Sequence, residues 1–201
     1  MRKDKFIELV KTSVFSGTAT VDRMDVADPR RIELDITAAL NTIFFKIFKK
    51  DPSNLDRYSK QYLSVPVLYE SSTQIYYSIL PANVIQFPVV GDGIWNINTM
   101  TGRDVTFNPI EMGNQEFLFD SEWKEIDDVI GFSLNGNRVD YFNFDPMITA
   151  VKMNLIVAFT EWAIDEDVPI PSGQDLEVLN IVRQMYNMKP VDKLDNQNEV
   201  A

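Results

Sequence analysis

The sequence predicts an α+β fold: N-terminal helices, a central and mostly antiparallel β-sheet, then a C-terminal helix and a flexible acidic tail. Before residue 60 the apolar residues recur at helical spacing, and after it apolar and polar residues alternate. The pair Asn135-Gly136 lies between two alternating segments, which is typical of an antiparallel hairpin with a type I′ turn. We therefore divide the chain into an N-terminal helical region at 1–60, a β-rich domain with its closing helix at 61–188, and a disordered tail at 189–201.

Two helices are predicted in the N-terminal region. The first spans residues 3–14 and is amphipathic. The second begins at Asp28, a plausible N-cap, and Pro29 takes the first helical position, where its missing N–H costs nothing. Its expected buried face comprises Ile32, Ile36, Ala39, Leu40, Ile43, Phe44 and Ile47. The lysines at its end, Lys46, Lys49 and Lys50, complement the helix dipole, an interpretation we prefer to a phosphate patch because the chain is acidic.

Alternation then predicts strands at 62–69 and 74–80, joined by a turn at Glu70-Ser-Ser-Thr. Gly91-Asp-Gly forms a further turn and is too short for a phosphate loop. Another strand begins at Ile94. Residues 100–127 lack a steady period and are expected to form a long loop with a short strand or helical turn at 117–124, which either makes functional contacts or covers the sheet as a satellite cluster. The run 148–162 fits a long strand or a helix, and the sequence leaves both open.

The segment from Asp165 into the last helix has the clearest local chemistry. Pro169 and Pro171 remove backbone donors and make the chain extended there. Ser172 and Asp175 stand at the spacing of a capping box, so a helix is expected to start at this point. The helix carries a broad apolar face, which suits a core helix or a contact with a neighbouring subunit. The polar tail after it lacks the apolar residues to order by itself and is expected to order against a partner chain.

Composition excludes several classes of function. The chain has 201 residues with no cysteine and no histidine, which rules out thiolate sites, Ser-His-Asp triads and histidine-dependent zinc centres within it. Its formal net charge of -11 disfavours binding to nucleic-acid phosphates or to an anionic membrane. No apolar run is long enough to span a bilayer, and the start does not look like a signal peptide.

The remaining candidate chemistry rests on carboxylates and aromatic rings. The acids at Asp127-Asp128 and Asp165-Glu166-Asp167 are of the type that holds Mg²⁺ or Ca²⁺, but neither matches a known metal loop, so solvated surface is the preferred interpretation. We therefore assign no catalytic residue, cofactor or metal. The tyrosines of the first strands are interpreted as core or interface packing in preference to base or sugar stacking, because no basic residues are interleaved with them. They are Tyr58, Tyr62, Tyr69, Tyr76 and Tyr77.

Four features together resemble the small neck and tail ring proteins of crAss-like, short-tailed bacteriophages. They are the helical start with Asp28-Pro-Arg-Arg, the strand end Tyr77-Ser-Ile-Leu-Pro-Ala, the Gly91-Asp-Gly-Ile turn, and the Val168-Pro-Ile-Pro-Ser-Gly helix entry followed by an acidic tail. The resemblance implies a non-enzymatic virion protein of the head-to-tail connector, assembled in the bacterial host cytoplasm. It implies a cyclic homo-oligomer of about a dozen copies that meets the portal and other neck or tail proteins. DNA would only pass through the channel, and an acidic wall would not retain it.

Under this hypothesis, contacts between subunits are expected from the helix entry, the last helix, the long middle loop and the tail. The candidate interface residues are Ile170, Pro171, Leu176, Leu179, Val182, Tyr186, Val191, Leu194, Phe117 and Trp123. Two alternatives come from other classes of protein. One is a phage-encoded, carboxylate-dependent hydrolase or carbohydrate-binding module, which needs a pocket with two convergent acids and aromatic walls. The other is a partner-binding protein outside the virion that stays monomeric until its target is present.

Overall fold

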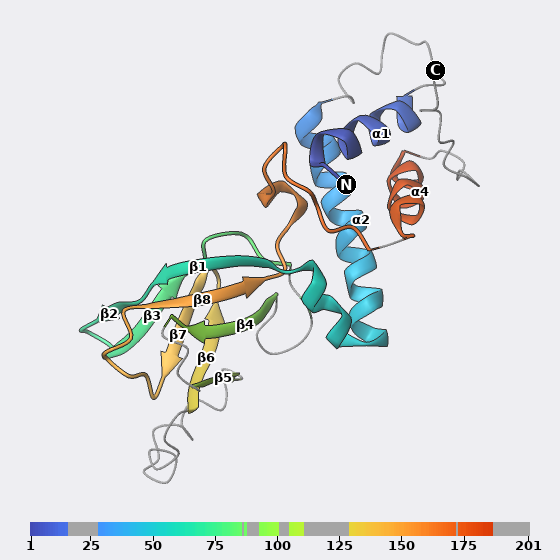
Figure 1. Cartoon of the computed structure of the whole chain (residues 1–201). Helices are drawn as coiled ribbons and strands as arrows, with labels where there is room; N and C mark the ends of the chain where they lie inside the picture. Colours follow the sequence, from blue (N-terminus) through green and yellow to red (C-terminus); the bar gives the residue numbers. More distant parts are fainter. Residues whose placement is uncertain are drawn as a thin grey trace. The chain divides into compact units, whose positions relative to one another are not determined.

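The computed structural model describes residues 1–15, 28–85, 87, 93–100, 105–110, 129–171 and 173–186 (Figure 1). The chain is α+β, as predicted, with helices at the N-terminal end, mostly antiparallel sheets in the middle and a helix near the C-terminal end. It divides into a helical unit, Met1–Tyr58 with Ala158–Ala201, and a β-rich unit, Ser59–Val157. The β-rich unit is therefore an insertion between two segments of the helical unit.

The helical unit contains three α-helices and two 3-10 helices among its described residues. They are α1 (Lys3–Phe15), α2 (Pro29–Lys50), η2 (Pro52–Tyr58), η5 (Phe159–Glu161) and α4 (Asp175–Met185). The predicted start of α2 is confirmed, because Asp28 Oδ1 accepts a hydrogen bond from the Arg30 backbone N–H at 3.0 Å and Pro29 is the first helical residue. The core of this unit combines side chains from both chain segments. It includes Phe6, Val10, Ile32, Ile36, Ile43, Phe159, Leu179 and Val182.

The first residues of the chain run antiparallel to residues 164–168. The Lys3 N–H donates to the Glu166 carbonyl and the Asp4 N–H to the Ile164 carbonyl, each at 3.0 Å, and the Val168 N–H donates to the Met1 carbonyl at 3.0 Å. These bonds pair backbone groups of two segments that are far apart in the sequence. They tie the beginning of α1 to the segment that precedes α4.

Helix α4 differs from the prediction in its start and in its neighbours. It begins at Asp175, its N-cap is Gln174, and that side chain makes no capping hydrogen bond. Asp175 is therefore the first helical residue and cannot be the third residue of a capping box. Ser172 lies outside the described residues. We expected this helix to close the β-rich domain, but it packs on α1 and α2 because its apolar face completes the core that those helices leave open.

The described part of the β-rich unit contains two sheets. The three-stranded sheet has the order β1-β8-β4 and the five-stranded sheet has the order β2-β3-β7-β6-β5. Their strands are β1 (Lys60–Pro66), β2 (Leu68–Glu70), β3 (Ile75–Ile79), β4 (Ile94–Thr99), β5 (Thr106–Pro109), β6 (Val129–Asn135), β7 (Arg138–Phe142) and β8 (Ala150–Leu155). All pairings are antiparallel except that of β5 with β6, which is parallel. The two sheets contact each other through β1 with β3 and β4 with β5.

Several predicted strands are confirmed with changed limits. The run 62–69 is two strands, because the chain leaves the three-stranded sheet at Val67 and β2 then pairs with β3 across the predicted turn. The run 148–162, for which the sequence left strand and helix open, forms strand β8 followed by the 3-10 helix η5. The predicted hairpin is present as β6-β7, but its loop residues are Gly136 and Asn137, because Asn135 pairs with Arg138.

The hairpin turn itself corrects the prediction of a type I′ turn. Among the two loop residues only Gly136 has a positive φ, at 64°. Glycine alone in the first central position is the preference of a type II′ turn, whereas a type I′ turn requires positive φ at both central positions. The shift by one residue follows from the register, in which Leu134 opposes Val139 and the alternation of the two strands is preserved.

Strand β5 was not predicted. It lies within the expected long loop at 100–127, and it pairs in parallel with β6 from Thr106 to Pro109. Parallel strands are joined by a long connection, so the alternation within one strand does not predict which strand it pairs with. The expected short element at 117–124 lies outside the described residues, and so do the tail at 189–201 and the first two residues of the Gly91-Asp-Gly turn.

Gly93, the last residue of that turn, has a packing role. A Cβ atom at this position would lie 2.5 Å from the Ile85 carbonyl oxygen and 3.0 Å from the Ile156 carbonyl oxygen. Backbone hydrogen bonds also join these segments. The Ile85 N–H donates to the Ile156 carbonyl, and the Ile156 N–H donates to the Gly93 carbonyl, each at 2.8 Å. Glycine is therefore needed for close approach of three backbone segments.

Candidate functional site

The structure places six of the ten candidate interface residues. Leu179 and Val182 are fully buried, and both belong to the core of the helical unit. Pro171 is also buried, while Ile170, Leu176 and Tyr186 are partly exposed. The burial favours the core-helix interpretation of α4, because its most apolar face is already covered by α1 and α2. The other four candidates lie outside the described residues: Phe117, Trp123, Val191 and Leu194.

Polar contacts hold α4 in place at its C-terminal end. The Tyr186 hydroxyl donates to Asp35 Oδ2 at 2.6 Å, and Arg183 Nη1 donates to the backbone carbonyl and to the hydroxyl of Ser13. Burial, with the hydrogen bond to Asp35, raises the pKa of Tyr186 to about 12. These bonds leave α4 attached to both α1 and α2, so the helix is a structural part of this unit.

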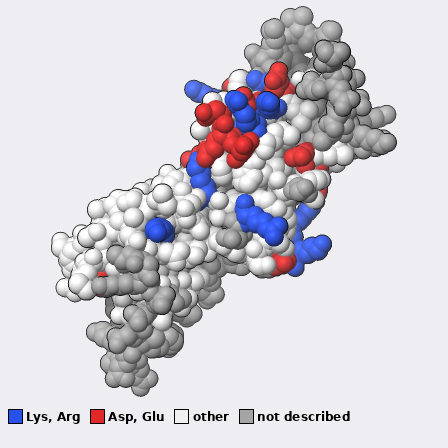
Figure 2. All heavy atoms as spheres, viewed as in Figure 1, with Lys and Arg blue, Asp and Glu red and all other residues white. Residues whose placement is uncertain are grey.

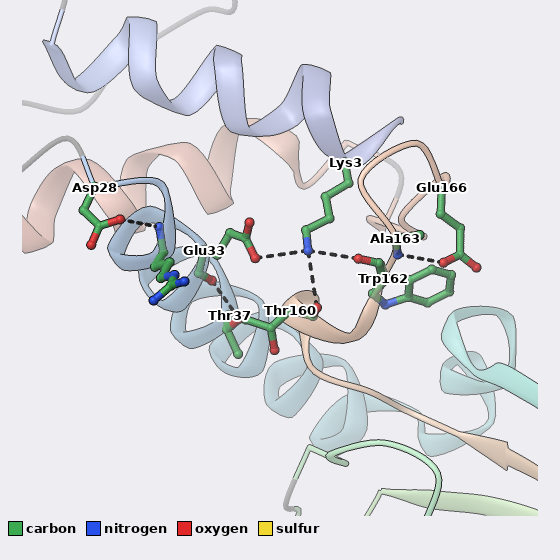
Figure 3. Close-up of polar contacts among 9 residues, drawn as sticks. Lys3, Asp28, Glu33, Thr37, Thr160, Trp162, Ala163 and Glu166 are labelled. Atoms are coloured by element: carbon green, nitrogen blue, oxygen red, sulfur yellow. Dashed lines mark hydrogen bonds and ion pairs between the residues drawn. The ribbon is translucent and has the colours of Figure 1, made fainter.

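A buried lysine lies at the start of α1 (Figure 3). Lys3 is 4% exposed, and its Nζ donates to the carbonyl oxygens of Trp162 at 2.9 Å and Thr160 at 3.3 Å. The same atom lies 3.1 Å from Glu33 Oε2 and 5.2 Å from the centre of the Phe159 ring. A buried ammonium group is tolerated only when its donors are used, and here two carbonyls and a carboxylate use them. The lysine therefore joins α1, α2 and η5, and it is not a free nucleophile or base.

The five-stranded sheet has an unusual distribution of side chains on β3. Successive residues of a strand point to opposite faces. Ser78 is fully buried, so Tyr76 and Ser78 mark the inner face, and Ile75, Tyr77 and Ile79 point outward. A sheet with one solvated face normally places its apolar residues inward and its polar residues outward. Strand β3 does the reverse at these positions, and Ile79 is 43% exposed.

The neighbouring strands extend this outward surface. Leu68 of β2 lies opposite Tyr77, and Arg138 of β7 lies opposite Ile79. Residues opposite each other on one face have neighbouring side chains. Leu68 is 44% exposed. We call the set Leu68, Ile75, Tyr77, Ile79 and Arg138 the outer patch.

Arg138 is held rigidly within the outer patch. Its Nη2 donates to Glu70 Oε2 at 2.9 Å, its Nε donates to Asp140 Oδ1 at 2.5 Å, and its guanidinium lies 3.9 Å from the centre of the Tyr77 ring. The hydrogen bond from Arg138, and then that from Thr73, lowers the pKa of Glu70, and the two carboxylates raise the pKa of Arg138. The cation is therefore neutralised by its own chain and stacked on an aromatic ring.

The inner face of the same sheet is a row of aromatic side chains. Tyr69 contacts Tyr76 with ring centres 4.8 Å apart, and Tyr141 stacks on Phe144 at 4.9 Å. The Tyr141 hydroxyl donates to Ser78 Oγ at 3.0 Å, and burial raises the pKa of Tyr141 well above its usual range. The Ser78 hydroxyl donates in turn to the Pro66 carbonyl at 2.9 Å. The tyrosines in these contacts pack with each other, in accordance with the sequence-based interpretation.

The two units differ in surface charge. In the described part of the β-rich unit, the basic side chains are Lys60, Arg138 and Lys152 and the acidic ones are Glu70, Asp140 and Asp145, and every one is at least partly buried. On the face shown in Figure 2, the described surface of this unit is almost entirely white, whereas red and blue gather over the helical unit. The exposed charged residues of the helical unit include Arg2, Lys5, Glu8, Arg30, Arg31, Lys49, Lys50, Asp165 and Asp167.

The acidic clusters of the sequence do not form a metal site in the part of the chain that the structure describes. There, no group of three or more His, Cys, Asp or Glu side chains is placed to hold a metal ion. Glu166 Oε2 instead accepts a hydrogen bond from the Ala163 N–H at 2.9 Å, and Asp167 faces the terminal amine of Met1 at 3.7 Å. Asp127 and Asp128 lie outside the described residues. Among the described helices, none has the length and apolar character needed to cross a membrane.

The chain matches no model of a known protein family and no curated protein sequence. The resemblance to phage ring proteins therefore remains a hypothesis based on the four sequence features.

Sequence reasoning missed the outer patch. A signal was present, because strict alternation in Ile75-Tyr-Tyr-Ser-Ile79 puts two isoleucines and a tyrosine on one face and a tyrosine and a serine on the other. That pattern alone would suggest that the isoleucine face is the inner one. Only the pairing with β7, where Val139 lies opposite Ser78 and both are buried, shows that the serine face is the inner one.

Proposed function

We propose that this chain is a non-enzymatic structural subunit of the virion that assembles into a cyclic homo-oligomer in the neck or tail of a short-tailed, crAss-like bacteriophage. The ring would join the portal to other neck or tail proteins and would let DNA pass without binding it. The phage part of the proposal is supported by the four sequence features that resemble the ring proteins. The self-assembly part is supported by the structure of the β-rich unit.

The observation that carries self-assembly is the surface of that unit. A soluble monomer usually keeps charged side chains exposed over its whole surface, and the centres of protein interfaces are depleted of them. In the described part of the β-rich unit, every Lys, Arg, Asp and Glu is partly buried, while several apolar side chains are exposed: Leu63, Leu68, Tyr69, Ile79 and Met147. A surface of this kind is suited to be covered by protein.

An enzymatic function has weaker support. The carboxylates of Glu70 and Asp140 converge, as a hydrolase would require, but both bind Arg138. A general acid needs a raised pKa so that it keeps its proton near neutral pH. The hydrogen bond from Arg138 instead lowers the pKa of Glu70. Arg138 occupies both carboxylates, an arrangement that suits packing better than proton transfer.

The proposal is tested by the mass of the purified chain in solution. Light scattering over a concentration series is expected to show a closed oligomer, and electron microscopy of the same sample is expected to show rings. A portal complex added to the chain is expected to bind saturably. A chain that stays monomeric at every concentration and does not bind the portal would overturn the proposal and favour a hydrolase or a monomeric adaptor.

A further inference from the structure

We propose that Asn135, at the tip of the β6-β7 hairpin, is a self-modification site at which the side-chain amide is lost and an aspartate or isoaspartate residue forms. The residue that follows it is Gly136, the first residue of the hairpin loop. This chemistry goes beyond the proposed function and does not depend on whether the chain assembles into a ring.

The reaction needs an electrophile and a nucleophile from two adjacent residues. The Gly136 backbone nitrogen loses its proton and attacks Cγ of Asn135, and the new C–N bond closes a succinimide ring. The side-chain amide group leaves with a proton as ammonia. Water then adds to one of the two ring carbonyls and breaks the bond from that carbon to the ring nitrogen, which leaves aspartate or isoaspartate. Water is the sole co-reactant, and the two reacting groups are already held close together by the chain.

The electrophile is accessible. Asn135 is exposed, and among the described residues nothing forms a hydrogen bond with its side chain. Two other asparagines differ in this respect. Asn143 Nδ2 donates to the Val129 carbonyl at 3.0 Å. Asn54 Nδ2 donates to an Asp51 carboxylate oxygen at 2.7 Å. Those two amides must first give up a hydrogen bond before their Cγ atoms can be attacked, whereas the Asn135 amide has none to lose.

The nucleophile is accessible as well. Asn135 and Arg138 are the last pair of the hairpin ladder, so the Gly136 N–H lies in the two-residue loop and outside the ladder. Within the described part of the chain, this N–H donates no hydrogen bond. Glycine has no Cβ, and no atom lies within 4 Å of the place where one would be. Ring closure therefore meets little steric hindrance at Gly136, whereas phenylalanine follows Asn143.

The product would change the charge and the backbone of the hairpin tip. Asn135 lies directly opposite Arg138, so the two side chains are neighbours on one face of the sheet. Arg138 already binds Glu70 and Asp140, and the new carboxylate would be a third acid beside one guanidinium. In isoaspartate the backbone runs through Cβ and Cγ, which adds an atom to the main chain and disturbs the pairing with Arg138.

The experiment follows the three asparagines in one sample. The full chain is incubated at low concentration at neutral and at mildly alkaline pH, and peptide mapping by mass spectrometry measures amide loss at each position. In the folded chain, Asn135 is expected to convert at least about tenfold faster than Asn143 or Asn54. Its rate should rise with pH, because the deprotonated nitrogen is the nucleophile. Water with a heavy oxygen isotope should leave one heavy oxygen in the product.

Two controls separate the fold from the dipeptide. The same chain in urea gives the rates of the unfolded sequence, and folding is expected to slow Asn135 by less than about tenfold and to slow Asn143 and Asn54 more. Asn135→Gln keeps an amide at this position but would have to close a larger ring, so the variant is expected to keep its amide. Fragmentation by electron transfer distinguishes isoaspartate from aspartate in the parent.

Three results would overturn the proposal. One is a folded chain in which Asn135 keeps its amide while it converts in urea, because the fold would then protect the site. Another is amide loss at Asn143 or Asn54 as fast as at Asn135 in the folded chain. The third is amide loss from Asn135→Gln at the rate of the parent. A chain that is monomeric in light scattering would overturn the ring and leave this site unaffected.

Discussion

The helical unit and the β-rich unit differ in how many charged side chains their described surfaces expose. The helical unit carries a dense mixture of exposed charges, and its polar groups make specific contacts such as those of Lys3 and Tyr186. In the described part of the β-rich unit every Lys, Arg, Asp and Glu is partly buried, and Arg138 is paired with two carboxylates. The contrast teaches that the large negative net charge of the chain says little about any one described surface, because the exposed charged residues are distributed unevenly between the two units.

The largest effect on stability is expected when the buried ammonium group of Lys3 in the helical unit is removed. Lys3→Met keeps most of the side-chain volume but leaves Glu33 and two carbonyls without their donor. We expect the free energy of unfolding to fall by about 3 kcal/mol, at the low end for a broken buried pair because Glu33 still reaches water. Thermal and denaturant unfolding, followed by circular dichroism, measures it. Lys5→Met, at an exposed position of the same helix, is the control and should change stability little.

The β-rich unit is expected to depend on backbone approach more than on charge. In Gly93→Ala, the added methyl group would meet the carbonyl oxygens of Ile85 and Ile156. Because both are backbone atoms, the chain must shift, and we expect a loss of about 2 kcal/mol in the free energy of unfolding. Gly136→Asn at the hairpin turn is a useful comparison, because no atom lies within 4 Å of a Cβ there and asparagine tolerates positive φ. If Gly93→Ala leaves the denaturation midpoint unchanged, the backbone at position 93 does not lie this close to the Ile85 and Ile156 carbonyl oxygens in solution.

The attachment of α4 gives a smaller effect that depends on pH. The raised pKa of Tyr186, about 12, means that the folded chain keeps this proton while the unfolded chain loses it near pH 10. The stabilisation is therefore complete below pH 10 and is lost as pH rises through about 12. Tyr186→Phe should cost about 1 kcal/mol at neutral pH and should flatten this part of the stability profile. A variant whose alkaline profile matches that of the parent would show that Asp35 does not hold this hydroxyl.

The smallest effect is expected for the ion network of the outer patch. The pKa of Glu70 is below its ordinary value of 4.5, so this group stabilises the fold above that pH and ceases to do so as pH falls through the lowered pKa. Glu70→Gln should reduce the melting temperature slightly at neutral pH, because water and salt screen a surface pair. In acid, the variant and the parent should converge. A difference that persists at low pH would indicate that the amide disturbs packing and that charge is not the cause.

Local sequence rules predicted the parts of the fold that local chemistry determines. The cap at Asp28, the buried face of α2 except Ile47, which is partly exposed, and the hairpin near Gly136 all follow from neighbouring residues. The position of α4, the parallel strand β5 and the one-residue shift of the hairpin loop depend on partners distant in the sequence, which a local pattern does not contain. The outer patch was missed for the same reason, since the inner face of β3 is defined by β7.

The insertion of the β-rich unit into the helical unit determines the order in which the chain can mature on the ribosome. Helices α1 and α2 are synthesised first, but Leu179 and Val182, which complete their core, follow the entire inserted unit. Until then, the apolar face of α2 lacks its final cover, while residues 59–157 can already form their sheets. We therefore expect the nascent chain to be most prone to aggregation in this interval, because the core of the helical unit is incomplete until α4 has been synthesised.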